Sequence, residues 1–124
     1  MRRFRFVLAF ATLSFLVGCG RDCLGLAQRY AAELPKALSC DPAVPVTQCG
    51  VARPVVSYVQ EGQNLSLEGL GSCMHSMNPA HTATLDKVLA DFYDNGCKLL
   101  PLPVCTDVVD RCYVNGQGIA TCYP

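Results

Sequence analysis

The sequence predicts a small, disulfide-rich α+β domain, and three observations support this class. Nine of the 124 residues are cysteines. Apolar residues recur at helical spacing in two segments, at about 23–38 and about 79–94. Near the C-terminus, two short β-prone runs flank a turn that contains Asn-Gly, which is typical of a hairpin. We therefore expect two main helices, short strands and a C-terminal β-hairpin.

The N-terminus has the features of an export signal. Three arginines among the first five residues precede an apolar run over residues 6–17, which only one threonine and one serine interrupt. A transmembrane helix needs roughly 18 or more apolar residues, and this run is shorter. The segment therefore indicates export rather than a membrane span.

The apolar run ends at Leu16-Val17-Gly18-Cys19, which resembles the lipobox of bacterial lipoproteins. The resemblance implies that residues 1–18 are a signal peptide, that Cys19 carries a diacylglycerol, and that many bacteria add a further acyl chain there. Two or more chains anchor a protein almost permanently, at about 0.8 kcal/mol per buried CH₂. The alternative is a plain secretory signal with an unrelated cysteine, although no A-x-A-like cleavage site follows the run.

Cysteine parity agrees with lipidation of Cys19, because an even number of cysteines then remains. These are Cys23, Cys40, Cys49, Cys73, Cys97, Cys105, Cys112 and Cys122. Export favours their use in disulfides, whereas the absence of any C-x-x-C pair disfavours structural zinc. Sequence does not determine the pairing. We expect Cys40 with Cys49 and Cys112 with Cys122, because each pair flanks a short, turn-rich loop.

The expected organisation is a lipidated tether over residues 19–22, followed by a single disulfide-stapled domain over 23–124. Removal of the three signal arginines leaves the mature chain with more acidic than basic side chains, and no basic stripe indicates nucleic acid. Lipid, rather than surface charge, must then attach the protein to the membrane. The tether spans at most about 14 Å when extended, which favours a partner close to the membrane.

The first predicted helix follows Asp22, which suits the N-cap position. Its buried face is expected to comprise Cys23, Ala27, Tyr30, Leu34 and Leu38. Pro35 is expected to kink the helix or to make it restart. Residues 40–72 are expected to be irregular with short strands, of which 55–60 is the clearest, and Gly62, Gly69 and Gly71 indicate a loop.

The second predicted helix has the clearest boundaries. Asn78 suits the cap, Pro79 the first helical position, and Asn95-Gly96 the stop. Leu85, Val88, Leu89 and Phe92 would form its apolar face. Prolines then alternate with apolar residues over 99–104, which permits an edge strand or a polyproline segment. Residues 111–114 and 119–123 are expected to pair as the terminal hairpin.

Taken whole, the chain resembles a group of small cysteine-rich bacterial lipoproteins of uncharacterised function. The similarity lies in an early Cys/Tyr/Leu helix, a central Gly-Ser-Cys-Met-His segment at 71–75, and a cysteine-dense tail. It implies the boundary of the domain and no activity.

One segment suggests a metal site, since thioether and imidazole groups together suit copper. Met74, His75, Met77 and His81 lie within eight consecutive residues. The alternative is that both methionines pack near the start of the second helix and that His81 lies in its first turn.

The sequence contains no catalytic constellation. An even cysteine count leaves no free thiol as nucleophile, and no G-x-S-x-G motif is present. We therefore expect a non-catalytic envelope lipoprotein that binds an envelope protein or a cell-wall partner through a rigid, disulfide-framed surface. Its expected location is the periplasmic face of the outer membrane or the cell surface rather than the inner membrane. The alternatives are a copper-binding lipoprotein and an inhibitor of a secreted hydrolase that uses the loop at 41–48.

Overall fold

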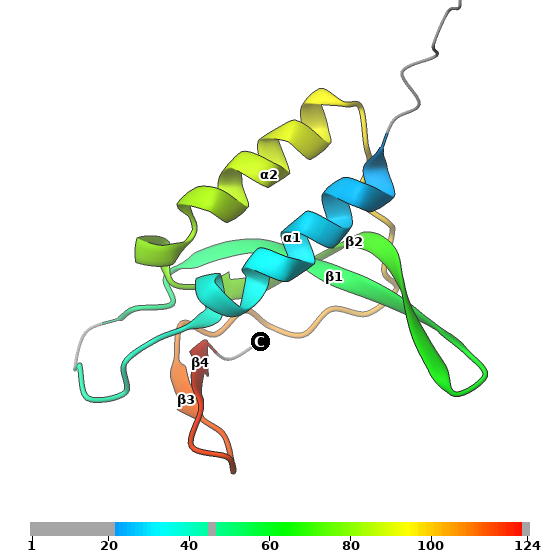
Figure 1. Cartoon of the computed structure of the whole chain (residues 1–124). Coiled ribbons are helices and arrows are strands. Elements are labelled where there is room, and N and C mark those ends of the chain that lie inside the picture. Colours follow the sequence, from blue (N-terminus) through cyan, green and yellow to red (C-terminus); the bar gives the residue numbers. More distant parts are fainter. Residues whose placement is uncertain (1–21, 45–46, 123–124) are drawn as a thin grey trace, which may run out of the picture.

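The computed structural model describes residues 22–44 and 47–122. Its elements, in chain order, are α1 (Cys23–Leu38), β1 (Val51–Glu61), β2 (Asn64–Met77), the 3₁₀ helix η1 (Pro79–His81), α2 (Ala83–Asp94), β3 (Cys112–Val114) and β4 (Ala120–Cys122). Strands β1 and β2 form one antiparallel sheet, and β3 and β4 form another. The two long helices lie side by side over the β1–β2 sheet, while the small C-terminal hairpin projects separately (Figure 1). This confirms the small α+β class with two helices and a terminal hairpin.

Helix α1 has the predicted bounds and the predicted buried face. A carboxylate oxygen of Asp22 accepts a hydrogen bond from the backbone N–H of Gly25 at 3.0 Å, which caps the helix. Ala27 and Tyr30 are fully buried, and the other members of the face pack against the same core. The helix continues through Pro35 to its end at Leu38, so it does not restart there.

The middle of the chain differs from its prediction. Residues 51–77 form one long hairpin rather than an irregular region, and Gly62 turns the chain with a φ of +64°. Gly69 and Gly71 lie inside β2, so assigning them to a loop was wrong. A Cβ atom on Gly71 would lie 2.5 Å from Cδ1 of Leu102. Glycine is present because another segment packs closely here, not because the chain turns.

The segment that packs against Gly71 contains Leu100 and Leu102 and runs along the free edge of β2. The N–H of Leu100 donates to the carbonyl of Leu70 at 2.7 Å, and the N–H of Ser72 donates to the carbonyl of Leu100 at 2.8 Å. A single parallel bridge joins Gly71 to Leu100, and residues 99–104 otherwise form no strand. The proline-interrupted run is therefore a covering segment rather than a full edge strand.

The second helix begins later than predicted, because its first turn is a separate 3₁₀ helix. The Asn78 side chain caps this turn by accepting a hydrogen bond from the N–H of Ala80 at 3.0 Å. The α-helix proper starts at Ala83 and ends at Asp94. Its predicted apolar face packs into the core, with Leu85, Val88 and Phe92 buried and Leu89 partly buried.

All eight cysteines of the described region form disulfides. The pairs are Cys23–Cys97, Cys40–Cys112, Cys49–Cys122 and Cys73–Cys105. The predicted pairs Cys40–Cys49 and Cys112–Cys122 were therefore wrong. An isolated β-bridge between Ser39 and Thr121 places the end of α1 beside β4. Cys40 and Cys49 therefore meet cysteines of the terminal hairpin rather than each other.

Candidate functional site

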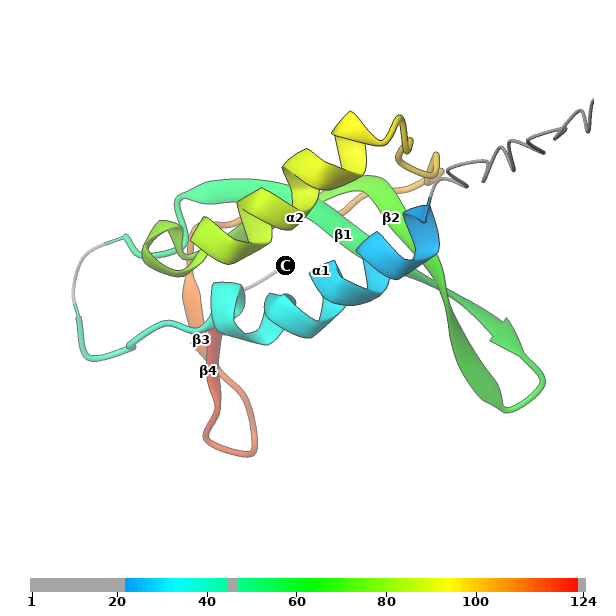
Figure 2. The same ribbon diagram turned by 45° about the horizontal axis from the view of Figure 1, so that its top comes forward.

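The outer part of the β1–β2 hairpin, residues 58–67, carries exposed apolar side chains; we call it the hairpin arm. Tyr58 is 54% exposed and Leu65 is 71% exposed. Both views of the molecule show the tip of this hairpin extending beyond the helices that cover its base (Figures 1 and 2). Single exposed apolar residues are common on protein surfaces, but exposed apolar side chains that lie together often mark an interaction site.

The register of the hairpin gathers these side chains on one face. Tyr58 lies opposite Leu67, and Gln60 lies opposite Leu65. Directly opposed residues share a face, as do alternate residues of one strand. Tyr58, Leu65 and Leu67 therefore form an apolar face of the arm, on which Tyr58 and Leu65 are exposed and Leu67 is partly buried against the core.

The base of the arm is set by an irregularity in the sheet. The register shifts between Ser57 and Tyr58, and the hydroxyl of Ser57 donates a hydrogen bond to a carboxylate oxygen of Glu68 at 3.1 Å. Such a shift bends a hairpin and redirects its outer part. Within the described residues, each strand of the arm pairs only with the other, so both strands present an open edge.

Two neighbouring residues of β1 attach the base of the hairpin to the helices. The buried hydroxyl of Tyr30 in α1 donates to the carbonyl of Pro54 at 2.7 Å, and burial raises the pKa of this phenol. Arg53 contacts Asp86 of α2 through Nε and Oδ1 at 2.6 Å. Its hydrogen bonds to Asp86 lower the pKa of that carboxyl and raise the pKa of the guanidinium. The arm therefore projects from a firmly held base.

The side chains of the Met/His segment lie on two elements and differ in burial. Met77 is completely buried in the hydrophobic core. Met74 and His75 are consecutive in β2 and point to opposite faces of the strand, while His81 lies outside the sheet in η1. Nδ1 of His75 lies 2.8 Å from the carbonyl oxygen of Ser76. Met77 therefore packs in the core, as the alternative to a metal site expects, whereas Met74 is 40% exposed and does not.

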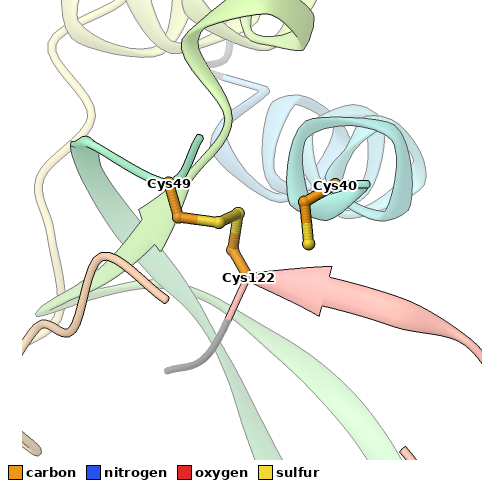
Figure 3. Close-up of side chains that lie close together, drawn as sticks. All are labelled: Cys40, Cys49 and Cys122. Atoms are coloured by element: carbon orange, nitrogen blue, oxygen red, sulfur yellow. A yellow bond between two sulfur atoms is a disulfide. The ribbon is translucent and has the colours of Figure 1, made fainter. Parts of the chain in front are cut away.

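Among the described residues, one group of cysteine, histidine or acidic side chains is close enough to hold a metal ion. It comprises Cys40, Cys49 and Cys122, whose sulfur atoms all lie within 4.8 Å of one another. Figure 3 shows the Cys40 sulfur beside the Cys49–Cys122 bridge. All three sulfurs are used in disulfides, so the group consists of two adjacent bridges.

The loop proposed for a hydrolase inhibitor is held at both ends. Its flanking residues Cys40 and Cys49 are each bridged to the terminal hairpin. The N–H of Asp41 donates to Oε1 of Gln48 at 2.9 Å, and Nε2 of Gln48 donates back to the carbonyl of Asp41. Residues 45–46 lie outside the described residues, and the inhibitor hypothesis stays a prediction.

The signal peptide at 1–18 and the lipidation site Cys19 also lie outside the described residues. Within the described residues, no helix has the length and apolarity needed to cross a membrane. Four disulfides indicate an extracytoplasmic location.

The hairpin arm was missed at the sequence level, although a signal for it exists. Apolar and polar residues alternate over 64–67 on one side of Gly62, and Tyr58 and Val59 precede it on the other.

Comparison with known proteins finds no matching family model, no similar curated protein and no similar solved structure.

Proposed function

We propose that this protein is a non-catalytic, lipid-anchored envelope lipoprotein that binds a second envelope protein through the hairpin arm. The observation that carries the proposal is the exposed apolar pair of Tyr58 and Leu65 on one face of a projecting hairpin. A partner that covers this face removes apolar surface from water, which is favourable at about 25 cal/mol per Å².

The open edges of the arm suggest how the partner binds. An extended segment can add a strand to an exposed sheet edge, where backbone hydrogen bonds give affinity and alternate side-chain positions give specificity. A strand added along the arm would lie beside Tyr58 or Leu65. We therefore assign to the partner an extended, apolar segment that pairs with the arm.

The charge of the arm favours a protein over a lipid surface. Residues 58–68 contain Glu61 and Glu68 but no lysine or arginine. Segments that bind anionic membranes normally combine apolar side chains with basic ones. Acidic side chains at the tip and the base oppose approach to phosphate head groups.

The position of the arm agrees with a partner near the membrane. In both views, the tip of the hairpin lies toward the same end of the molecule as the start of α1 at Cys23 (Figures 1 and 2). A lipid on Cys19 would emerge only a few residues from this end. The arm would then meet partners in or close to the membrane plane.

Site-specific photocrosslinking in intact cells tests the proposal. A photoreactive amino acid replaces Leu65 in one chain and Ile119, which is 56% exposed on the other hairpin, in a matched control. We expect one discrete protein adduct from position 65 and none of that mass from position 119. The purified adduct partner should then bind the unmodified protein, with at least tenfold weaker binding by Tyr58→Ser and unchanged binding by Ile119→Ser.

Three results would overturn the assignment. Adducts from position 65 with phospholipid alone would point to a membrane surface, and adducts with glycan alone would point to the cell wall. The same protein adducts from both positions would show that the arm is not selective.

A further inference from the structure

The C-terminal hairpin is held by two bridges that lie next to each other. Cys40 is bonded to Cys112 and Cys49 to Cys122, and the sulfur of Cys40 lies within 4.8 Å of both sulfurs of the second bridge (Figure 3). We propose that the two bridges form a thiol–disulfide exchange site. A low-molecular-weight thiol there converts the observed pairing into Cys40–Cys49 and Cys112–Cys122.

The two bridges differ in exposure, which sets where the thiol enters. Cys49 and Cys122 are each 1% exposed, whereas Cys40 and Cys112 are partly exposed. Exchange depends on access of the attacking thiolate to a sulfur atom. The Cys40–Cys112 bridge is therefore the entry point, and the buried bridge is reached only from inside, through Cys40.

The alternative pairing is compatible with the backbone. Cys112 and Cys122 are directly opposed residues of the antiparallel β3–β4 pair. Opposed residues in such pairs have Cα atoms about 4.5 to 5.5 Å apart, within the range that a disulfide spans. Cys40 and Cys49 already hold their sulfur atoms within 4.8 Å. Neither new bond requires a distant segment to approach.

The exchange balances in three steps. An external thiolate attacks the sulfur of Cys112, forms a mixed disulfide there, and expels Cys40 as a thiolate. This thiolate attacks the sulfur of Cys49, so that the Cys40–Cys49 bond forms and the electron pair of the broken bond leaves on Cys122. The Cys122 thiolate then attacks Cys112 and releases the external thiolate unchanged. No net oxidation or reduction occurs.

The consequence is the release of the terminal hairpin. In the observed pairing, two covalent bonds join this hairpin to the two ends of the 41–48 loop. In the exchanged pairing, the hairpin is bonded only to itself and the loop only to itself. The β-bridge between Ser39 and Thr121 then still pairs the hairpin with the end of α1.

Tryptic digestion without reduction distinguishes the two pairings. Trypsin cuts after Lys36, Lys87 and Arg111 but not between Arg53 and Pro54, so Cys40, Cys49 and Cys73 share peptide 37–87 and Cys112 and Cys122 share peptide 112–124. The purified full-length protein is incubated with substoichiometric glutathione, acid-quenched and alkylated. We expect a time-dependent release of free peptide 112–124 that carries an internal disulfide, while the intact mass stays unchanged.

Two paired variants test the route. Cys23→Ala/Cys97→Ala removes a bridge elsewhere and should leave the release unchanged. Cys40→Ala/Cys112→Ala removes the entry bridge. With the same glutathione, opening of the buried Cys49–Cys122 bond in this variant should take at least ten times as long as in the wild-type chain.

Persistent linkage of peptide 112–124 to the Cys40 peptide in the wild-type chain would overturn the proposal. Release of peptide 112–124 only with both of its cysteines alkylated would indicate simple reduction and would also overturn the proposal. Equal reactivity of the Cys49–Cys122 bond in the Cys40→Ala/Cys112→Ala variant would rule out the internal relay.

Discussion

Arg53 and Asp86 make a two-point contact that joins β1 to α2. Nε of Arg53 lies 2.6 Å from Oδ1, and Nη2 lies 3.1 Å from Oδ2. The next residue, Pro54, accepts the hydroxyl of Tyr30 from α1. Two consecutive residues of one strand thus fix both helices, and the hairpin arm begins four residues later.

Replacing Asp86 by asparagine removes the charge of this contact and leaves its shape. Because the pair is partly exposed, we expect a loss of about 1 kcal/mol in the free energy of unfolding. Urea titration at pH 7 measures it. Asp94→Asn, at the exposed end of α2, is the matched control and should change the stability by less than about 0.5 kcal/mol. Equal losses of stability in the two variants would show that the Arg53–Asp86 contact adds nothing to the free energy of unfolding.

The same contact predicts a dependence on pH. Arg53 lowers the pKa of Asp86 in the folded protein, so the unfolded chain binds this proton more readily. The stabilisation is therefore complete above the ordinary pKa of aspartate and is lost as the pH falls through the lowered value. The stability difference between wild type and Asp86→Asn should narrow over that acidic range. A constant difference would contradict the assignment.

Tyr30→Phe tests the contact from α1. The variant keeps the ring in the core but leaves the buried carbonyl of Pro54 without its donor, which costs about 1 to 3 kcal/mol. Chemical denaturation followed by circular dichroism checks the value. Tyr93→Phe, at an exposed position of α2, should be nearly neutral, and a neutral Tyr30→Phe would show that the carbonyl has another partner.

Gly71→Ala tests the close packing of the covering segment on β2. The new methyl group would lie 2.5 Å from Cδ1 of Leu102 and 3.1 Å from Cγ2 of Val55, so we expect destabilisation by about 1 to 3 kcal/mol. Gly116→Ala is the control, because nothing lies within 4 Å of its added carbon. Thermal unfolding compares the two, and a similar melting temperature for both would refute the packing argument.

The helices were predictable because their information is local. The spacing of Ala27 and Tyr30 and the cap at Asp22 determine α1 within its own segment. Strand β2 was not predictable in this way, because Gly69 and Gly71 are explained by side chains of Leu100 and Leu102, about thirty residues later. A glycine that turns the chain and a glycine that allows another segment to approach look identical in sequence.

The prediction of the disulfide pairs was wrong for a related reason. Short loops favour Cys40 with Cys49, but the fold brings Cys112 and Cys122 from more than 70 residues away. The apolar face of the arm depends on register, which places Tyr58 opposite Leu67. Neither relationship is visible until the chain has folded.

The bond between Cys23 and Cys97 has a mechanical consequence. Tension applied at the N-terminal end of the domain enters at Cys23, the first residue of α1, and passes through sulfur directly to the segment that follows α2. The load bypasses the hydrogen bonds of α1, so this helix cannot be peeled away turn by turn from its leading end. Under force applied at its N-terminal end, the domain would therefore begin to unfold at an element other than α1.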